Sequence, residues 1–196
     1  MNSNQQSPKL NDVSQFLLDM FLEPYKDNCK YLKNAHIQDS KDGIPLHKWQ
    51  NIDETEWIIK GDFSIPESCY IDDTGHFNAV EFNICYNQLC YILVAYLVEN
   101  KLLDSMKYWD LKTYKQRQLS NCLIAKFSSK FKKQINARRF QGLLSINKSS
   151  SRGNLIILKT SCAFYDDNEG WAEGDVTIAI LNEVETIEPV KERAIA

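Results

Sequence analysis

Polar side chains gather in the first half of a stretch that is otherwise apolar. The sequence from Phe77 to Val98 contains no Gly or Pro, and its second half, LCYILVAYLV, is apolar on every side, which predicts an enclosed helix. Six polar residues nevertheless occur at its beginning: His76, Asn78, Glu81, Asn83, Asn87 and Gln88. Burying an unpaired amide or hydroxyl group costs about 1 to 3 kcal/mol. These side chains are therefore expected either to bond to one another or to line a cavity that holds a polar ligand.

Helical spacing divides the polar groups between two sides of this helix. At 100° per residue, one arc holds Asn78, Glu81, Cys85 and Gln88, and a roughly opposite arc holds Asn83, Asn87 and Tyr91. A helix that is polar on two sides and apolar at one end favours a binding site along its length. The alternative is a purely structural helix whose asparagines are satisfied within the protein.

The turn before this helix could stabilise a developing negative charge. Asp72, Asp73, Thr74 and Gly75 interrupt the preceding strand-like run and offer an N-cap. Amide groups from Gly75 onward, together with the positive end of the helix dipole, would suit a carbonyl oxygen that gains negative charge during a reaction. We therefore expect an oxyanion site at the start of the helix.

The chain offers neutral hydrogen-bond donors and few bases. Its three histidines are scattered, and it contains no HxxxH motif, no paired carboxylates at catalytic spacing and no Gly-rich phosphate loop. We expect neither a metal site nor a hydrolytic triad. If the reaction needs a general base, His76 or Glu81 would supply it, whereas Asn78 would help to bind the substrate.

Three motifs around the helix resemble the FcoT family of acyl-thioester enzymes. They are ESCY at 67–70, TGHFNAVE at 74–81 and YNQL at 86–89. Similar segments follow in the family's order: LEPY at 22–25, RQLSNCLIAKFSSKFKK at 117–133 and FYDDNEGWAEGDVTIAIL at 164–181. The resemblance covers about 16–181 and implies a hot-dog fold, in which a curved antiparallel sheet wraps around a long central helix. It also places Tyr25, Tyr70 and Asn87 at the family's catalytic positions.

The resemblance implies an enzyme that acts on fatty acyl thioesters by one of two reactions. Family members in isonitrile lipopeptide pathways add the glycine amine to C3 of a (2E)-enoyl group on acyl carrier protein, and others are described as long-chain fatty acyl-CoA thioesterases. Negative charge builds on the thioester oxygen in both reactions. We favour glycine addition, because it accounts for a neutral, tyrosine-rich site. Hydrolysis is the alternative, and a noncatalytic acyl-binding protein is the third interpretation.

The same resemblance implies the partners of the chain. No cofactor is expected beyond the CoA or phosphopantetheine group that carries the substrate, and glycine would be the second substrate. Hot-dog chains of this kind pair their sheets edge to edge and place active sites between protomers. We therefore expect a homo-oligomer, with a hexamer as the working guess.

A basic segment without acidic residues extends from 126 to 139. Phe127 and Phe131 alternate with its six cations: Lys126, Lys130, Lys132, Lys133, Arg138 and Arg139. We take Lys130, Lys132 and Lys133 as candidates for binding the phosphates of CoA or the acidic surface of an acyl carrier protein that bears phosphopantetheine. The alternative is a solvated face that binds nothing.

Hydrophobic patterns on both sides of the central helix predict one α+β domain over 13–182. Strands are expected at 29–38 and 57–65 before the helix and, as a meander, at 140–147, 155–165 and 171–181 after it. The pattern also predicts a short helix at 13–22 and a helical or mixed segment at 116–126. It assigns three further stretches to a disordered N-terminus, a surface insertion and a loose tail, namely 1–12, 39–56 and 183–196.

Composition limits the partners and the compartment. The chain of 196 residues is 43% hydrophobic, enough for one core, and its net charge of -3 does not favour nucleic-acid binding. Its longest apolar run, ten residues at 89–98, is too short to span a bilayer, and its first residues lack the apolar core of a signal peptide. We therefore expect a cytoplasmic protein with no membrane span, in which all six cysteines are reduced thiols.

Overall fold

A curved antiparallel sheet forms the body of the protein. The computed structural model describes residues 10–38, 57–72 and 74–182. The sheet has seven strands in the order β1-β2-β3-β5-β6-β7-β4. The strands are β1 (Leu10–Asp12), β2 (Leu32–Gln38), β3 (Ile58–Phe63), β4 (Cys122–Lys133), β5 (Phe140–Arg152), β6 (Leu155–Tyr165) and β7 (Trp171–Leu181).

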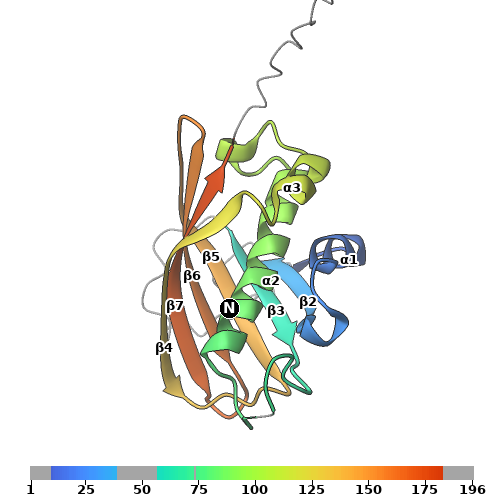
Figure 1. Cartoon of the computed structure of the whole chain (residues 1–196), viewed down its shortest axis with the longest axis vertical. Helices are drawn as coiled ribbons and strands as arrows, with labels where there is room; N and C mark the ends of the chain where they lie inside the picture. Colours follow the sequence, from blue (N-terminus) through green and yellow to red (C-terminus); the bar gives the residue numbers. More distant parts are fainter. Residues whose placement is uncertain (1–9, 39–56, 73, 183–196) are drawn as a thin grey trace, which may run out of the picture.

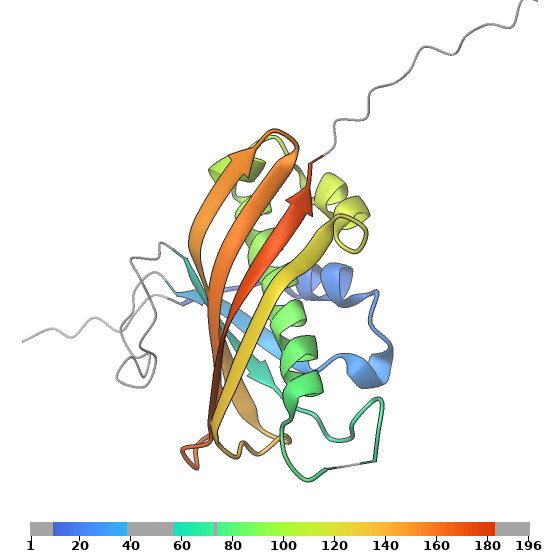
Figure 2. The same ribbon diagram turned by 60° about the vertical axis from the view of Figure 1, so that its left-hand side comes forward.

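Helix α2 (Ala79–Glu99) lies against the concave face of this sheet (Figures 1 and 2). The shorter helices α1 (Gln15–Leu22) and α3 (Leu111–Arg117) pack against it, and 3-10 turns occur at Asp27–Cys29 and Asp104–Met106. The predicted α+β hot-dog fold, a curved antiparallel sheet around a long central helix, is thereby confirmed.

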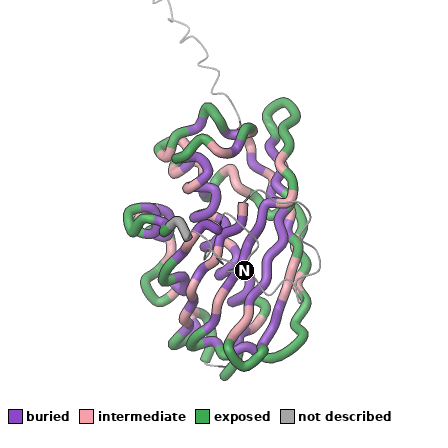
Figure 3. The backbone as a smooth tube through the Cα atoms, turned by 180° about the vertical axis from the view of Figure 1, so that it is seen from behind, coloured by how far each residue is buried: buried purple, intermediate pink, exposed green. Residues whose placement is uncertain are grey.

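The central helix is enclosed because it is apolar around most of its circumference. Phe82, Cys85, Leu89, Ile92 and Leu97 are each fully buried on α2. Seen from behind, buried positions run through the middle strands of the sheet, whereas exposed positions gather in the turns (Figure 3). In the part of the chain that the structure describes, no helix is both long and apolar enough to cross a membrane.

All five predicted strands are present, and a further strand, β4, had been predicted as a helical or mixed segment. The strands expected from 29–38 onward correspond to β2, β3, β5, β6 and β7, with β5 running on to Arg152. The helical or mixed segment expected at 116–126 is wrong, because α3 ends at Arg117 and β4 begins at Cys122. In β4, Phe127 contacts α2 through Phe82, while Lys126 and Lys130 are exposed. The sequence of β4 thus contains the two-residue alternation that is typical of a strand, but it was interpreted as a charged stripe.

The ends of the chain and the insertion were also assigned from the sequence. Leu10–Asp12, which was expected to be disordered, pairs with β2 as the edge strand β1. The remainder of the expected N-terminal disorder, the surface insertion at 39–56 and the tail from 183 lie outside the described residues.

Glycines allow aromatic rings to lie directly on the sheet. Gly61 of β3 and Gly142 of β5 are opposite each other in the register. A Cβ atom at Gly142 would meet ring carbons of Phe164 at 2.7 Å and of Phe63 at 2.8 Å. The rings of Phe63 and Phe164 pack edge to face with their centroids 5.6 Å apart. The aromatic core therefore occupies the space that a side chain at Gly142 would need.

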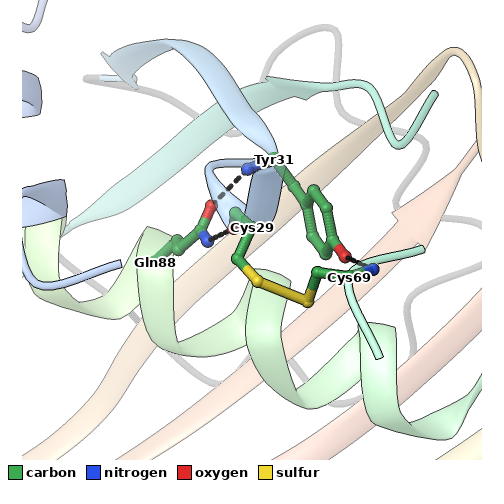
Figure 4. The surroundings of a disulfide bond; sticks show 4 residues. All are labelled: Cys29, Tyr31, Cys69 and Gln88. Atoms are coloured by element: carbon green, nitrogen blue, oxygen red, sulfur yellow. Dashed lines mark hydrogen bonds between the residues drawn. A yellow bond between two sulfur atoms is a disulfide. The ribbon is translucent and has the colours of Figure 1, made fainter. Parts of the chain in front are cut away.

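A disulfide joins the segment before β2 to the loop that precedes α2, and a buried amide joins the same segment to α2 itself (Figure 4). Cys29 and Cys69 are bonded, with their Cα atoms 5.5 Å apart. Gln88 of α2 accepts hydrogen bonds from the amides of Tyr31 (3.0 Å) and Leu32 (2.9 Å) and donates to the Cys29 carbonyl oxygen at 2.5 Å. All six cysteines were expected to be reduced, which is wrong for this pair: tertiary packing brings together two residues that are 40 apart in sequence.

Candidate active site

A capping box closes the start of α2. Asn78 Oδ1 accepts hydrogen bonds from the amides of Val80 (3.0 Å) and Glu81 (3.2 Å), and Glu81 Oε2 accepts one from the Asn78 amide (3.2 Å). The Phe77 amide donates to the carbonyl oxygen of Ile135. We expected free amides here and a cap drawn from the preceding turn. That expectation is wrong, because Asn78 is itself the N-cap and its side chain takes two of the amides.

Tyr70 lies against this cap. Its hydroxyl donates to Asn78 Oδ1 at 2.8 Å, although 46% of the residue is exposed. The preceding residue is fixed twice, since Cys69 is bonded to Cys29 and its amide donates to the Tyr31 hydroxyl at 3.0 Å (Figure 4). These links hold the Tyr70 backbone beside the start of α2.

A cavity of about 380 Å³ lies next to the same end of the helix. Residues before and within the first turn of α2 line it together with the end of β4: His76, Phe77, Asn78, Ala79, Phe131, Lys132, Lys133 and Gln134. The imidazole Nδ1 of His76 lies 2.9 Å from the carbonyl oxygen of Thr74. Gly75 occupies the exposed turn just before, at a φ of 75°. The structure thus brings His76 and Asn78 together with two of the three predicted lysines.

The two cavity lysines are paired with acidic side chains. Lys132 Nζ lies 2.7 Å from Glu173 Oε1, and Lys133 Nζ lies 3.0 Å from Glu169 Oε2. Partly exposed pairs of this kind contribute about 0 to 1 kcal/mol, so a phosphate could replace either carboxylate at little cost. With the positive end of the α2 dipole beside them, the cavity favours an anion. Lys130 is exposed on β4 and is not part of the cavity wall.

A second group of predicted residues surrounds a smaller cavity further along α2. Asn87 lines this cavity, whose volume of about 20 Å³ suits one water-sized group. Its other walls are mostly apolar: Cys90, Tyr91, Val94, Tyr114, Cys122, Ile124, Leu158, Ile178 and Ile180. The ring centroid of Tyr25 lies 6.4 Å from that of Tyr91. Tyr25 and Asn87 therefore border one apolar region.

Burial keeps the tyrosines and thiols of this region protonated. It raises the pKa of Tyr25 far above its usual value, to which the neighbouring Tyr91 adds, and burial likewise raises the pKa of Tyr91 to about 12. Both hydroxyls are therefore donors at neutral pH and not bases. Burial also raises the pKa of Cys90 and Cys122 to about 12, so neither is a nucleophile at neutral pH.

The predicted site residues thus form two groups at different levels of α2. Tyr70 and Asn78 belong to the first, and Tyr25 and Asn87 to the second. Asn78 and Asn87 are about two and a half turns apart, or about 13 Å along the helix axis. Within one protomer, Tyr70 and Asn87 do not share an oxyanion site. Glu81 is only 2% exposed, and its carboxylate is part of the capping box.

Sequence reasoning gave no functional role to two residues of the second level. Tyr91 lines the apolar cavity, and Asn83 carries a buried Oδ1 atom without a hydrogen-bond partner. Their spacing from Asn87, four residues on either side, places all three on one side of α2. That arc was visible in the sequence, but no motif distinguished its members from core residues.

The arrangement suits an extended substrate that is charged at one end and apolar at the other. The lysine cavity would hold an anionic group, and the apolar cavity would receive the start of a hydrocarbon chain. Beside the apolar cavity, Tyr25 and Asn87 can donate hydrogen bonds to a carbonyl oxygen. An acyl thioester on a phosphorylated arm has this layout.

Comparisons with known proteins agree with this description. The profile of the FcoT-like thioesterase domain matches residues 20–180. The chain belongs to the FcoT-like thioesterase family. All ten of the predicted site residues fall within the FcoT-like domain.

Named relatives are similar over most of their length. A Streptomyces coeruleorubidus protein named (2E)-enoyl-[ACP] glycyltransferase is 39% identical over 175 residues, which cover 87% of this chain and 98% of that protein. A Mycobacterium tuberculosis protein of the same name is 36% identical over 174 residues, covering 87% and 88%. Among solved structures, that of a Staphylococcus aureus protein in complex with CoA aligns with a TM-score of 0.41 at 12% identity, over 63% of this chain and 70% of that chain.

Proposed function

We propose that this chain adds the amino group of glycine to C3 of a (2E)-enoyl group carried on acyl carrier protein. The observation that carries the proposal is the two-ended site along α2, with lysines and a helix N-terminus at one cavity and neutral donors at an apolar one. It fits a thioester on a phosphopantetheine arm. The name of relatives that are 33 to 39% identical supports the same reaction.

The bond changes define what the side chains must do. The glycine nitrogen attacks C3 and forms a C–N bond, while the C2=C3 π electrons move toward the carbonyl and produce an enolate. The nitrogen loses a proton to a base, C2 gains a proton, and the thioester remains intact. Tyr25 and Asn87 would donate hydrogen bonds to the enolate oxygen, which carries more charge in the transition state than in the substrate.

The remaining predicted residues would bind the carrier and move the proton. Lys132 and Lys133 would hold the phosphate of the arm, with Asn78 and the start of α2 beside it. Tyr70 would join the enolate site from a second protomer of a homo-oligomer. The base would be His76 or Glu81. No cofactor is required, and the reaction would serve isonitrile lipopeptide-type biosynthesis in the cytoplasm.

Hydrolysis of a fatty acyl thioester is the second candidate, and the FcoT-like thioesterase profile favours it. Both reactions place negative charge on the same oxygen, so the same donors serve either one. They differ in the nucleophile, which is water in hydrolysis, and in whether the C–S bond breaks.

Purified protein given a (2E)-enoyl thioester with and without glycine separates the two. We expect mass spectrometry to show an adduct heavier by one glycine with its thioester intact, and only slow hydrolysis of the saturated thioester. If free acid is released at equal rates with and without glycine, and no adduct forms, the chain is a thioesterase.

The pH dependence of adduct formation identifies the base. A general base acts when deprotonated, so its pKa appears as a limb in which the rate rises with pH. Glu81→Gln flattens this limb if Glu81 is the base, and His76→Gln does so if His76 is the base. A limb that persists in both variants would exclude both residues.

A further inference from the structure

Asn83 has a buried oxygen without a hydrogen-bond partner, and along α2 it comes between residues that line the two cavities. Ala79 lines the lysine cavity, and Asn87 and Cys90 line the apolar cavity. These residues and Asn83 follow one another on α2 at spacings of four, four and three, so they share one face of the helix. A molecule that extends from one cavity to the other along this face must pass Asn83.

Strand β4 borders the same path. Its end contributes Phe131 and Lys132 to the lysine cavity, and its beginning contributes Cys122 and Ile124 to the apolar cavity. Between these ends, Phe127 of β4 packs against Phe82 and Tyr86 of α2, and Phe131 packs against Phe82. The two cavities therefore lie at opposite ends of the same helix and strand.

The unpaired buried oxygen distinguishes Asn83 from Gln88 of α2 and from the N-cap Asn78. Gln88 uses both its oxygen and its nitrogen in bonds to the protein backbone, and Asn78 caps the helix. A buried acceptor without a donor costs about 1 to 3 kcal/mol, and native proteins contain few of them. In a binding region, a donor supplied by the substrate would remove that cost.

We propose that Asn83 Oδ1 accepts a hydrogen bond from the first amide N–H of the phosphopantetheine arm, the one nearest the sulfur. This inference rests on the proposed function, in which the thioester carbonyl lies at Asn87. Asn83 precedes Asn87 by about 6 Å along the axis, on the side of the lysine cavity. Four single bonds separate the thioester carbonyl carbon from that amide nitrogen, which gives a similar reach. Asn83 thereby makes the site select acyl groups on pantetheine over thioesters that lack the amide.

Two ligands that differ only at this amide test the proposal. We would use unreactive ketone analogues of the butanoyl thioesters, in which CH2 replaces sulfur, carrying either an acetamidoethyl or an acetoxyethyl group. The second ligand has oxygen in place of N–H. Calorimetry on the full chain should show about tenfold tighter binding of the amide, because a site built around a donor rejects the analogue without it.

The variant Asn83→Leu, of similar size, should bind both ligands equally. Gln88→Leu is the matched control: it removes an amide from the same helix, lowers stability, and should leave the tenfold preference unchanged. Loss of the preference in Asn83→Leu alone supports the proposal. An equal preference in wild type and Asn83→Leu, or no preference in wild type, overturns it.

This measurement is independent of the reaction. Failure to form a glycine adduct would refute the proposed function, whereas the ratio of the two dissociation constants would still report whether Asn83 contacts the arm.

Discussion

At the scale of single residues, burial decides what the polar groups of the site can do. Tyr25 has its pKa raised by burial and remains a donor, and Asn87 has no proton to lose at any ordinary pH. Both can therefore donate hydrogen bonds to an oxyanion, and neither acts as the base. The proton acceptor must come from elsewhere, and the candidates His76 and Glu81 lie at the other level of α2.

Replacing Asn87 by alanine tests its role as a donor to the enolate. We expect kcat to fall on the order of 10²-fold with KM nearly unchanged, since the bond strengthens only in the transition state. Steady-state rates of glycine addition measure this. Asn100→Ala is the control, because its amide caps the far end of the same helix. A rise in KM alone would assign Asn87 to substrate binding.

The sequence indicated candidate site residues, but it did not predict how these residues are arranged in space. Tyr70, Asn78 and Glu81 lie in recognisable motifs, and the structure joins them by hydrogen bonds. Motifs report local order along the chain, so they could not reveal that Asn78 closes the helix or that Cys29 reaches Cys69. Both facts depend on side-chain orientation and on contacts between distant segments.

At the scale of elements, the packing of β4 side chains against α2 shapes the site, and β4 was the strand that was not recognised from the sequence. Its two phenylalanines contact Phe82 of α2 although Phe131 is partly exposed, and charged residues flank them, so charge concealed a period of two. The helix was easier to predict, because a long apolar run without Gly or Pro has few alternatives. Its ends, Ala79 and Glu99, shifted by only one or two residues from those expected.

Enlarging the apolar cavity should change the preferred acyl chain. Ile178 is 6% exposed and forms part of its wall. We expect Ile178→Ala to move the maximum of kcat/KM toward longer chains, at a cost of about 2 to 5 kcal/mol in the free energy of unfolding. A series of enoyl thioesters of increasing length measures the shift.

Ile146→Ala provides the comparison, because it removes the same atoms from a buried position outside this cavity. An identical chain-length profile in both variants and the wild type would mean that the acyl chain lies elsewhere.

At the scale of the whole molecule, we expect partners to bind at the unpaired edge of the sheet and at the two cavity lysines. β4 is the last strand of the sheet, and no described segment pairs with its outer edge. Leu123, Ile124 and Phe131 are exposed along it, at 49%, 38% and 42%. A long exposed edge with apolar side chains favours pairing with another chain.

Reversing both cavity lysines should weaken carrier binding. We expect the Lys132→Glu, Lys133→Glu double variant to raise KM for a carrier-bound substrate much more than it lowers kcat, and the effect should shrink at about 1 M salt, where screening lengths fall to about 3 Å. Kinetics at two salt concentrations measure this. The pair Lys107→Glu, Lys112→Glu makes the same charge change on an exposed surface, and an equal rise in KM there would indicate a nonspecific effect.

The homo-oligomer should have active sites shared between protomers. Light scattering should show an assembly larger than a monomer at micromolar concentration, with a hexamer as our expectation. Mixing inactive Tyr70→Phe and Asn87→Ala chains should restore about a quarter of wild-type activity in randomly mixed pairs, because one site in four receives both intact residues. A stable monomer, or a mixture as inactive as its components, would contradict the shared site.

The contact between Gly142 and Phe164 also constrains how this protein can evolve. A methyl group at position 142 collides with the ring, whereas loss of the ring alone leaves a void, so each change is harmful by itself. Because a Cβ atom at position 142 would also meet the ring of Phe63, a joint change has to shorten both rings, as in Gly142→Ala with Phe63→Leu and Phe164→Leu. The three positions should therefore covary among homologues, and mutational libraries that vary one site at a time would find each of them intolerant while a viable combination remained unsampled.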